Sequence, residues 1–378
     1  MTSVKCRLCS MEVQDVDWIL EGMPRSAQGF LQPDSAGVDS QLSLEIFQCQ
    51  ACGLVQLKND PVAYFREVIR ATAFSEEMSK YRASQFRDFI DEFDLLGKTA
   101  IEIGCGEGEY LTLLERQGLK MQGLEYSHKS VAACQARGLN VSHGFINGDD
   151  VPGLSGNYAA CFMFNFLEHL PQPVSVLTAL ASKLDEQGVG LIEVPNFEMI
   201  QQQAMFTEFC SDHLLYFTTD TFCQILSRSG LEVLEINPIW GDYILSAKIR
   251  KRENFQTSTF EFAREDLSRS IENFLQGFSP KSVAIWGAGH QALAVMAACK
   301  LGDKIPYVID SATFKQNRMT PATHLMVFGP EILDRNPPEA ILVMAAAFSD
   351  EIISNIKLKH GDRFTLAVLR GQEIFLNP

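Results

Sequence analysis

Basic residues are scarce in this sequence, and the scarcity excludes one class of partner. Lysine and arginine together number 32, against 47 aspartates and glutamates, so the formal net charge is −15 at pH 7. A field of this sign repels the phosphate backbone of nucleic acids. We therefore expect no nucleic-acid partner, although a local basic patch could still hold one anionic ligand.

Long apolar runs are also missing. The longest runs, around residues 158–167 and 340–348, have the length of buried strands. A membrane-spanning helix needs about 20 apolar residues. The N-terminal MTSVKCRLCS has no apolar signal core. We expect a soluble, cytoplasmic protein with no membrane partner.

The sequence does contain enough apolar material for several cores. With 378 residues, of which 46% are hydrophobic, two or three domains are expected. Residues 1–57 carry paired cysteines around a loop-rich stretch, and residues 58–95 indicate a helical connector. Strands alternate with helices over 96–254 and again over 255–378. The pattern predicts an α/β protein: a doubly wound sheet closed by an antiparallel strand pair, then a second, Rossmann-like domain.

Four of the ten cysteines are paired, as Cys6-x-x-Cys9 and Cys49-x-x-Cys52. Two such pairs can present four thiolates to one tetrahedral Zn²⁺ ion. Because no further ligand is apparent in the sequence, we expect a structural zinc site in the N-terminal module. The alternatives are two redox-active CxxC motifs or simply buried thiols.

A glycine-rich loop follows the first strand of the central domain. Glu102 precedes glycines at alternate positions, Gly104, Gly106 and Gly108, and a helix comes directly after them. Alternate glycines let the backbone approach a bound nucleoside, and the helix start offers free N–H groups. The rhythm is GxGxG, whereas a dinucleotide site has GxGxxG. An ordinary glycine turn is the alternative.

Two later strand ends complete the predicted cofactor site. Glu125 ends the second strand, where a carboxylate can accept both hydroxyls of a ribose, and Tyr126 beside it can cover an adenine. Asn165 and Phe166 end the fourth strand and are expected to border the same cofactor.

Two histidines are candidates for chemistry. His169 follows the fourth strand, and Asp212 directly precedes His213 before a predicted helix. Both lie near the expected carboxyl ends of strands, where open sheets place their sites, and a carboxylate beside an imidazole can orient it as a general base. A structural hydrogen bond or a helix cap is the alternative, which we assign to His143 and His324. We expect Cys210 to be a buried thiol.

The second α/β unit carries its own glycine motif, Gly287-x-Gly289-His290-Gln291, between a strand and a helix, and Asp310 ends the next strand. The spacing fits a dinucleotide fingerprint with its acidic partner. It fits equally a clamp in which helix-start N–H groups and His290 grip a diphosphate, with Lys315 and Arg318 nearby. A structural glycine turn is the third possibility.

Taken together, these motifs resemble the nucleotide-sugar C-methyltransferases of deoxysugar biosynthesis over almost the whole chain. The segments that carry the resemblance are CRLC…CQACGLVQL, EIGCGEG, FLEHLPQP, SDHLLYFT and VAIWGAGHQALA…YVIDSATFKQNRMTPATH. The resemblance implies an N-terminal zinc module, a class I S-adenosylmethionine domain and a C-terminal domain that holds the nucleotide-sugar. The cofactor would lie on the glycine loop and Glu125, and the active-site positions would be His169, Asp212 and His213.

The sequence departs from this family at the active site. Where the family commonly shows Tyr-His-Glu-His, this chain has Cys210-Ser211-Asp212-His213, so a tyrosine is missing. Tyr81, Tyr216 and Tyr243 are possible substitutes, and Arg70 could contact an anion in the segment before the central domain. Predicted substrate-binding residues are therefore Arg70, Tyr81, Gly289, His290, Gln291 and Lys315.

Methylation at carbon requires an enolate, since carbon is a poor nucleophile until a proton next to a carbonyl is removed. We expect His213 to be the base, oriented by Asp212, while His169 binds the enolate or a sugar hydroxyl. The alternatives are an O- or N-methyltransferase, a bifunctional enzyme whose C-terminal domain binds NAD, and a non-catalytic assembly module. A monomer and a homodimer are both open.

Overall fold

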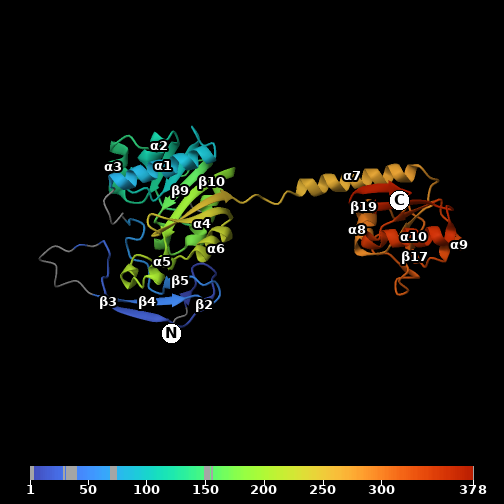
Figure 1. The fold of residues 1–378 in the computed structure, drawn as a ribbon, viewed down its shortest axis with the longest axis horizontal. Coiled ribbons are helices and arrows are strands. Elements are labelled where there is room, and N and C mark those ends of the chain that lie inside the picture. Colours follow the sequence, from blue (N-terminus) through green and yellow to red (C-terminus); the bar gives the residue numbers. More distant parts are fainter. Residues whose placement is uncertain are drawn as a thin grey trace. The chain divides into compact units, whose positions relative to one another are not determined.

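The computed structural model describes residues 4–28, 30, 41–68, 75–148, 154 and 156–377. The chain forms two compact units, Met1–Glu253 and Asn254–Pro378, and each is described by itself (Figure 1). No helix in the described part of the chain is both long and apolar enough to cross a membrane. The predicted α/β class is confirmed by the mixed seven-stranded sheet that each unit contains.

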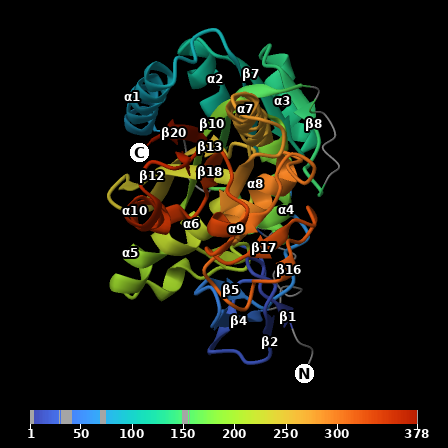
Figure 2. The same cartoon turned by 90° about the vertical axis from the view of Figure 1, so that its right-hand side faces the viewer.

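The N-terminal strands form a small module. A two-stranded sheet pairs β1 (Val4–Lys5) with β2 (Glu12–Val13). A four-stranded antiparallel sheet has the order β11-β5-β4-β3, with bounds Leu215–Tyr216, Val55–Leu57, Leu42–Gln48 and Trp18–Met23. Because β11 comes from the central region, the module shares a sheet with it. Both views place the blue strands β2, β4 and β5 at one end of the unit, near α5 (Phe197–Gln202) (Figures 1 and 2).

The central sheet has the strand order β12-β13-β10-β9-β6-β7-β8. Neighbouring strands from β10 to β8 run parallel, whereas β13 is antiparallel to both β10 and β12. The predicted closing pair is therefore present, with β13 inserted beside β10. The strands are β6 (Thr99–Ile103), β7 (Lys120–Glu125), β8 (Val141–His143), β9 (Tyr158–Phe164), β10 (Leu184–Pro195), β12 (Leu231–Ile239) and β13 (Ile244–Lys251).

Helices pack on both faces of this sheet, and each buries an apolar side. The helix α1 (Glu76–Glu92) is capped by Ser75, whose side chain accepts a hydrogen bond from the Met78 N–H. Its apolar residues recur at helical spacing, and Phe86 and Phe89 pack against Phe162 in the core of this unit. The other helices are α2 (Glu109–Arg116), α3 (His128–Ala136), α4 (Pro173–Ser182) and α6 (Thr219–Arg228).

The C-terminal unit is a second layered α/β domain with the strand order β16-β17-β15-β14-β18-β19-β20. Its edge strands β16 and β20 are antiparallel to their neighbours, and separate apolar clusters cover the two faces. The helix α7 opens this unit and buries Ile271 in its core. The elements are α7 (Thr257–Gln276), β14 (Val283–Trp286), α8 (His290–Ala298), β15 (Val308–Ile309), β16 (Arg318–Met319), β17 (Met326–Phe328), α9 (Ile332–Arg335), β18 (Ala340–Val343), α10 (Ser349–His360), β19 (Thr365–Arg370) and β20 (Glu373–Leu376).

Candidate functional site

The four paired cysteines converge on one point. Their sulfur atoms all lie within 4.8 Å of one another. The Sγ atoms of Cys6 and Cys52 are 3.6 Å apart, and those of Cys9 and Cys49 are 3.5 Å apart. Four thiolates around a tetrahedral zinc ion, with Zn–S bonds of about 2.3 Å, have sulfur separations of about 3.8 Å. The donor set therefore fits zinc in both chemistry and spacing.

The glycine loop between β6 and α2 has the backbone shape that only glycine adopts easily. Gly104, Gly106 and Gly108 all have positive φ angles, of 68°, 55° and 79°. A Cβ atom at Gly104 would lie 2.9 Å from the ring of Phe166. The loop therefore needs glycine both for its conformation and for the close approach of a neighbouring side chain.

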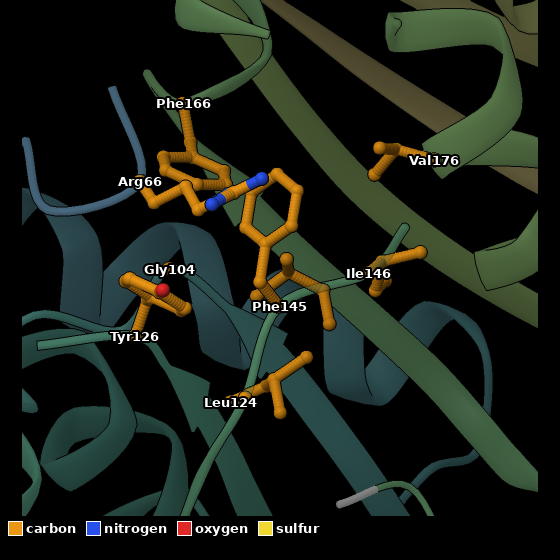
Figure 3. A pocket seen from close by; sticks show the side chains of 10 residues that line it. Arg66, Gly104, Leu124, Tyr126, Phe145, Ile146, Phe166 and Val176 are labelled. Atoms are coloured by element: carbon orange, nitrogen blue, oxygen red, sulfur yellow. The ribbon is translucent and has the colours of Figure 1, made fainter. Parts of the chain in front are cut away.

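A pocket over this loop is lined by three of the predicted cofactor residues. Gly104, Tyr126 and Phe166 line it together with Phe145 and Arg66 (Figure 3). The Arg66 guanidinium carbon lies 5.1 Å from the Phe145 ring centroid and 5.4 Å from that of Tyr126. Sequence reasoning missed Arg66 and Phe145, because neither belongs to a recognisable motif.

The predicted ribose carboxylate lies at the edge of the same loop. Glu125 Oε2 accepts a hydrogen bond from the Gly106 N–H at 2.9 Å, and Oε1 accepts one from the Ser127 N–H at 2.8 Å. Burial raises the pKa of Glu125, while these N–H donors oppose the shift. The glutamate is thus tied to the loop. The other predicted acid, Glu102, is buried on β6.

The two predicted histidines meet beside the end of β9. His169 lies in a short 3-10 helix, Leu167–His169, and its ring centroid is 4.8 Å from that of His213 in an edge-to-face arrangement. Desolvation lowers the pKa of His169 to about 4, and desolvation and the neighbouring imidazole also lower the pKa of His213. Both imidazoles are consequently neutral near pH 7 and able to accept a proton.

The environment of His169 defines its tautomer. Its Nδ1 lies 3.0 Å from the backbone oxygen of Asp212, and a carbonyl can only accept a hydrogen bond. In the neutral ring Nδ1 therefore carries the proton and Nε2 carries the lone pair.

A third titratable group, which sequence reasoning did not select, joins the cluster. Glu168 is only 1% exposed, and its Oε1 lies 3.8 Å from His169 Nε2. Glu168, His169 and His213 place their possible ligand atoms within 4.8 Å of one another. The only signal in the sequence was its position between Phe166 and His169.

We expected the carboxylate of Asp212 to orient His213, whereas its Oδ1 is hydrogen-bonded to other groups. Asp212 Oδ1 accepts hydrogen bonds from the hydroxyl of Tyr64 at 2.6 Å, from that of Ser211 at 3.3 Å and from the Ala27 N–H at 3.3 Å. Its influence on His213 is electrostatic and favours the protonated imidazole.

The three tyrosines considered as substitutes make other contacts, although the Tyr216 ring centroid lies 6.3 Å from that of His213. Tyr81 packs edge-on against Trp240, with ring centroids 5.4 Å apart, and Tyr243 hydrogen-bonds to Glu208. The hydroxyl of Tyr216 accepts a hydrogen bond from the Cys210 N–H at 3.2 Å. Arg70 falls outside the described residues. Among these tyrosines and Tyr64, the latter is the one hydrogen-bonded to Asp212, and it was not predicted.

A cavity of about 560 Å³ lies next to this tyrosine. Tyr64 and Ser211 form part of its wall, and the N-terminal module contributes Arg25, Ser26 and Ser43. The hydroxyl of Ser26 donates to that of Tyr64 at 2.8 Å. Ser211, two residues before His213, therefore lines a cavity to which the N-terminal module also contributes.

An ion pair between Asp310 and Lys315 lies beside the glycine motif of the C-terminal unit. Gly289 precedes α8, His290 is exposed and Gln291 is partly buried. Asp310 accepts hydrogen bonds from the Ala288 N–H and from Lys315, both at 2.8 Å. The acidic partner of a dinucleotide fingerprint is thus neutralised by a lysine, which holds the pKa of Asp310 below its usual value although burial opposes the shift.

Comparisons with known proteins bear on both units. Residues 76–236 match a methyltransferase domain, and residues 246–368 match a C-methyltransferase C-terminal domain. The C-methyltransferase NovU of Streptomyces niveus is 22% identical, over 96% of this chain and 95% of its own length. A ubiquinone biosynthesis O-methyltransferase of Marinobacter nauticus is 28% identical, over 29% of this chain and 49% of its own length.

Solved methyltransferase structures are similar to about half of the chain. An S-adenosylmethionine-dependent methyltransferase from Clostridium acetobutylicum covers 50% of this chain and 96% of its own, at 10% identity and a TM-score of 0.40. The plantazolicin methyltransferase BpumL, in complex with SAH, covers 48% of this chain and 87% of its own, at 14% identity and a TM-score of 0.37.

The strand order, the glycine loop and the matched domain define the class: this chain is an S-adenosylmethionine-dependent methyltransferase. The predicted class I fold and enzyme class are confirmed. The second matched domain and the full-length similarity to NovU place it more narrowly. The chain is a C-methyltransferase, distantly similar to NovU, with a four-cysteine cluster at its N-terminus.

Proposed function

We propose that the protein transfers the methyl group of S-adenosylmethionine to a ring carbon of a nucleotide-linked keto-deoxysugar. The observation that carries the proposal is the pair of neutral imidazoles, His169 and His213, whose rings are in contact. His169 comes three residues after Phe166, which lines the pocket over the glycine loop. An acceptor held at the histidines would lie close to a methyl donor on the loop. Such proximity is what an in-line transfer needs.

In this proposal His213 removes the proton next to the keto group. Its low pKa keeps the ring neutral at pH 7, and Asp212 stabilises the imidazolium that then forms. His169 accepts a hydrogen bond from a sugar hydroxyl through Nε2, because its Nδ1 proton is directed to the Asp212 carbonyl. Tyr64 keeps the Asp212 carboxylate in place.

The cofactor would be held by the glycine loop and the adjoining strand ends. Gly104, Gly106 and Gly108 would let the backbone approach the cofactor, and Glu125 would accept its ribose hydroxyls. Glu102, Tyr126, Asn165 and Phe166 would border it. Tyr126 and Phe166 line the pocket, which supports these two assignments.

The C-terminal domain would bind the nucleotide part of the substrate. Gly289, His290 and Gln291 would contact the diphosphate at the start of α8, with Lys315 nearby. The pairing of Asp310 with Lys315 speaks against NAD, because a ribose-binding carboxylate would be free of such a partner. We retain Tyr81 and Arg70 as proposed substrate contacts and leave open a monomer or homodimer.

The N-terminal cysteine cluster would hold one structural zinc ion. Cys6, Cys9, Cys49 and Cys52 supply four sulfur ligands, the set typical of closed structural sites. Its role would be to fold the module that carries part of the cavity wall near Tyr64. The zinc would take no part in the methyl transfer.

The test is a methyl-transfer assay on a panel of nucleotide-linked 4-keto-6-deoxysugars, with His213→Ala as the key variant. We expect a mass gain of one methyl group on the sugar, and a kcat lowered about 10²–10⁴-fold in the variant. Tight cofactor binding without transfer to any keto-sugar would contradict the substrate assignment. Equal kcat in the variant would contradict the base.

A further inference from the structure

We propose, on the basis of the function above, that Glu168 acts as a neutral carboxylic acid whose O–H binds the oxyanion formed on the substrate carbonyl. The enolate needs such a donor, because removing a carbon-bound proton places negative charge on the keto oxygen. His169 does not supply it, since its Nε2 carries a lone pair. His169 therefore offers the substrate an acceptor at Nε2 and no donor there.

The placement of Glu168 supports this role. The residue follows Phe166, which lines the cofactor pocket, by two positions and directly precedes His169. Its side chain is almost completely buried, and Oε2 has no hydrogen-bond partner in the described structure. The 3.8 Å separation of Oε1 from His169 Nε2 is too long for a hydrogen bond. One buried carboxyl oxygen is thus available at the histidine cluster.

The surroundings of Glu168 favour the protonated form. The titratable groups near Glu168 are His169 and His213, and the charge of Glu168 also acts on Cys210 and Tyr243. The histidines stay neutral because their pKa values are low, and burial raises the pKa of Cys210 to about 11 and that of Tyr243 well above its usual value. Across the described residues no lysine or arginine pairs with Glu168.

An ionised carboxylate at this position would therefore be buried without a compensating charge. Desolvation raises the pKa of Glu168 to about 8, which keeps the group protonated at neutral pH. The Asp212 carboxylate does not compensate it, since it has the same sign and is held by Tyr64.

The proposed reaction moves one proton and one methyl group. His213 takes the proton from the ring carbon, and the C–H electron pair forms the C=C bond of the enolate. The carbonyl electron pair moves to oxygen, which accepts the Glu168 proton or a short hydrogen bond from it. The enolate carbon then forms a C–C bond to the methyl group as the S–CH₃ bond breaks and its electrons stay on sulfur. The carbonyl re-forms, the proton returns to Glu168, and His213 releases its proton to water.

The kinetic test compares Glu168→Gln with Glu168→Leu. Glutamine keeps a donor of similar shape, so we expect kcat within about 10-fold of the wild type, whereas leucine should lower kcat about 10²–10³-fold. Wild-type kcat should fall as the pH rises through about 8, where Glu168 loses its proton, and this alkaline limb should vanish in Glu168→Gln. Glu115→Gln, on the helix α2, is a control that keeps the limb.

A second readout does not depend on the substrate being right. The folded state holds the Glu168 proton up to about pH 8, and the unfolded state releases it near 4.5. Wild-type stability should accordingly fall across this window and level off above it. Relative to Glu168→Gln, the wild-type melting temperature should drop by about 5–10 °C between pH 5 and pH 8. Parallel curves for the two proteins would overturn the buried neutral acid.

Glu168, His169 and His213 could instead bind a divalent cation. Metal analysis separates this case from the neutral acid. We expect metal analysis to find the same metal content in the wild type, in Glu168→Gln and in Glu115→Gln. An ion bound by the three side chains would be lost in Glu168→Gln and retained in Glu115→Gln. Such an ion, together with an inactive glutamine variant, would overturn the acid role. If the wild type methylates no keto-sugar but the pH-dependent stability holds, the proposed function fails while the neutral carboxyl stands.

Discussion

At the scale of single residues, the segment just before α1 connects the two halves of the site. Tyr64 hydrogen-bonds to Asp212 near the histidines, and Arg66, two residues later, lies among the aromatic side chains of the cofactor pocket. Neither residue was predictable, because their roles follow from where the chain folds back. Motif spacing did locate the glycine loop, the cysteines and the histidines, since those residues carry their chemistry in local patterns.

Tyr64→Phe should reveal the role of this segment. The change removes one hydrogen bond to a carboxylate, a contact of about 1.5–3 kcal/mol, so kcat should fall about 10–100-fold. Because Tyr64 is a positioning residue, the Kd for S-adenosylmethionine should stay the same. Tyr158→Phe, which removes a core hydroxyl bonded to Gln122, is the matched control. An unchanged kcat for Tyr64→Phe would remove the tyrosine from the account.

Gly104→Ala should weaken cofactor binding. Alanine at this position would have to adopt a positive φ of 68°. Its Cβ would also lie 2.9 Å from the Phe166 ring, so the loop must shift. We expect the calorimetric Kd for S-adenosylmethionine to rise about 10-fold or more. Gly138→Ala is the control, since it also has a positive φ, of 83°, but open space around it. A Kd for Gly104→Ala no higher than that of Gly138→Ala would contradict the need for glycine at position 104.

At the scale of elements, the sequence predicted the central sheet well. Strands of the parallel part are apolar, and helices with a 3.6-residue period separate them. The alternation of strands and helices could therefore be recognised in the sequence. The buried ion pair between α1 and β10 could not be predicted from the sequence. Arg82 and Glu193 are both fully buried, their side chains lie 2.6 Å apart, and 111 positions separate them in the chain. Polar partners this distant become visible only once the sheet is assembled.

Arg82→Met should strongly destabilise the N-terminal unit. The change leaves Glu193 buried without its cation, which costs about 3–5 kcal/mol of unfolding free energy. Urea denaturation measures the loss, and adding Glu193→Gln to the variant should recover part of it. Lys248→Met, which breaks a partly exposed ion pair with Glu92, should cost no more than about 1 kcal/mol. A loss of that size for Arg82→Met would contradict the importance of the buried pair.

At the scale of the whole molecule, the N-terminal module and the methyltransferase domain are one structure. Strand β5 of the module pairs with β11, which lies directly after His213. The sequence suggested a separate module, because cysteine spacing shows where a metal could bind but gives no information about strand pairing. Folding of the cysteine cluster should therefore influence the acceptor site.

Cys49→Ser should test this coupling. We expect loss of one bound zinc per chain, a lower melting temperature and reduced methyl transfer, because the sheet that supports His213 loses its metal-held neighbour. Metal analysis and calorimetry on the full chain measure the effects. Cys223→Ser, outside the cluster, should retain the metal. Full activity in a metal-free Cys49→Ser protein would show that the module is independent of the site.

The most direct test of the central claim is where the methyl group goes. The enzyme would be incubated with S-adenosylmethionine labelled with ¹³C in its methyl group and with a nucleotide-linked 4-keto-6-deoxysugar, and the product examined by carbon NMR. We predict that the labelled methyl carbon couples directly to a ring carbon adjacent to the keto group. A label attached to oxygen or nitrogen would contradict carbon methylation and the enolate mechanism with it.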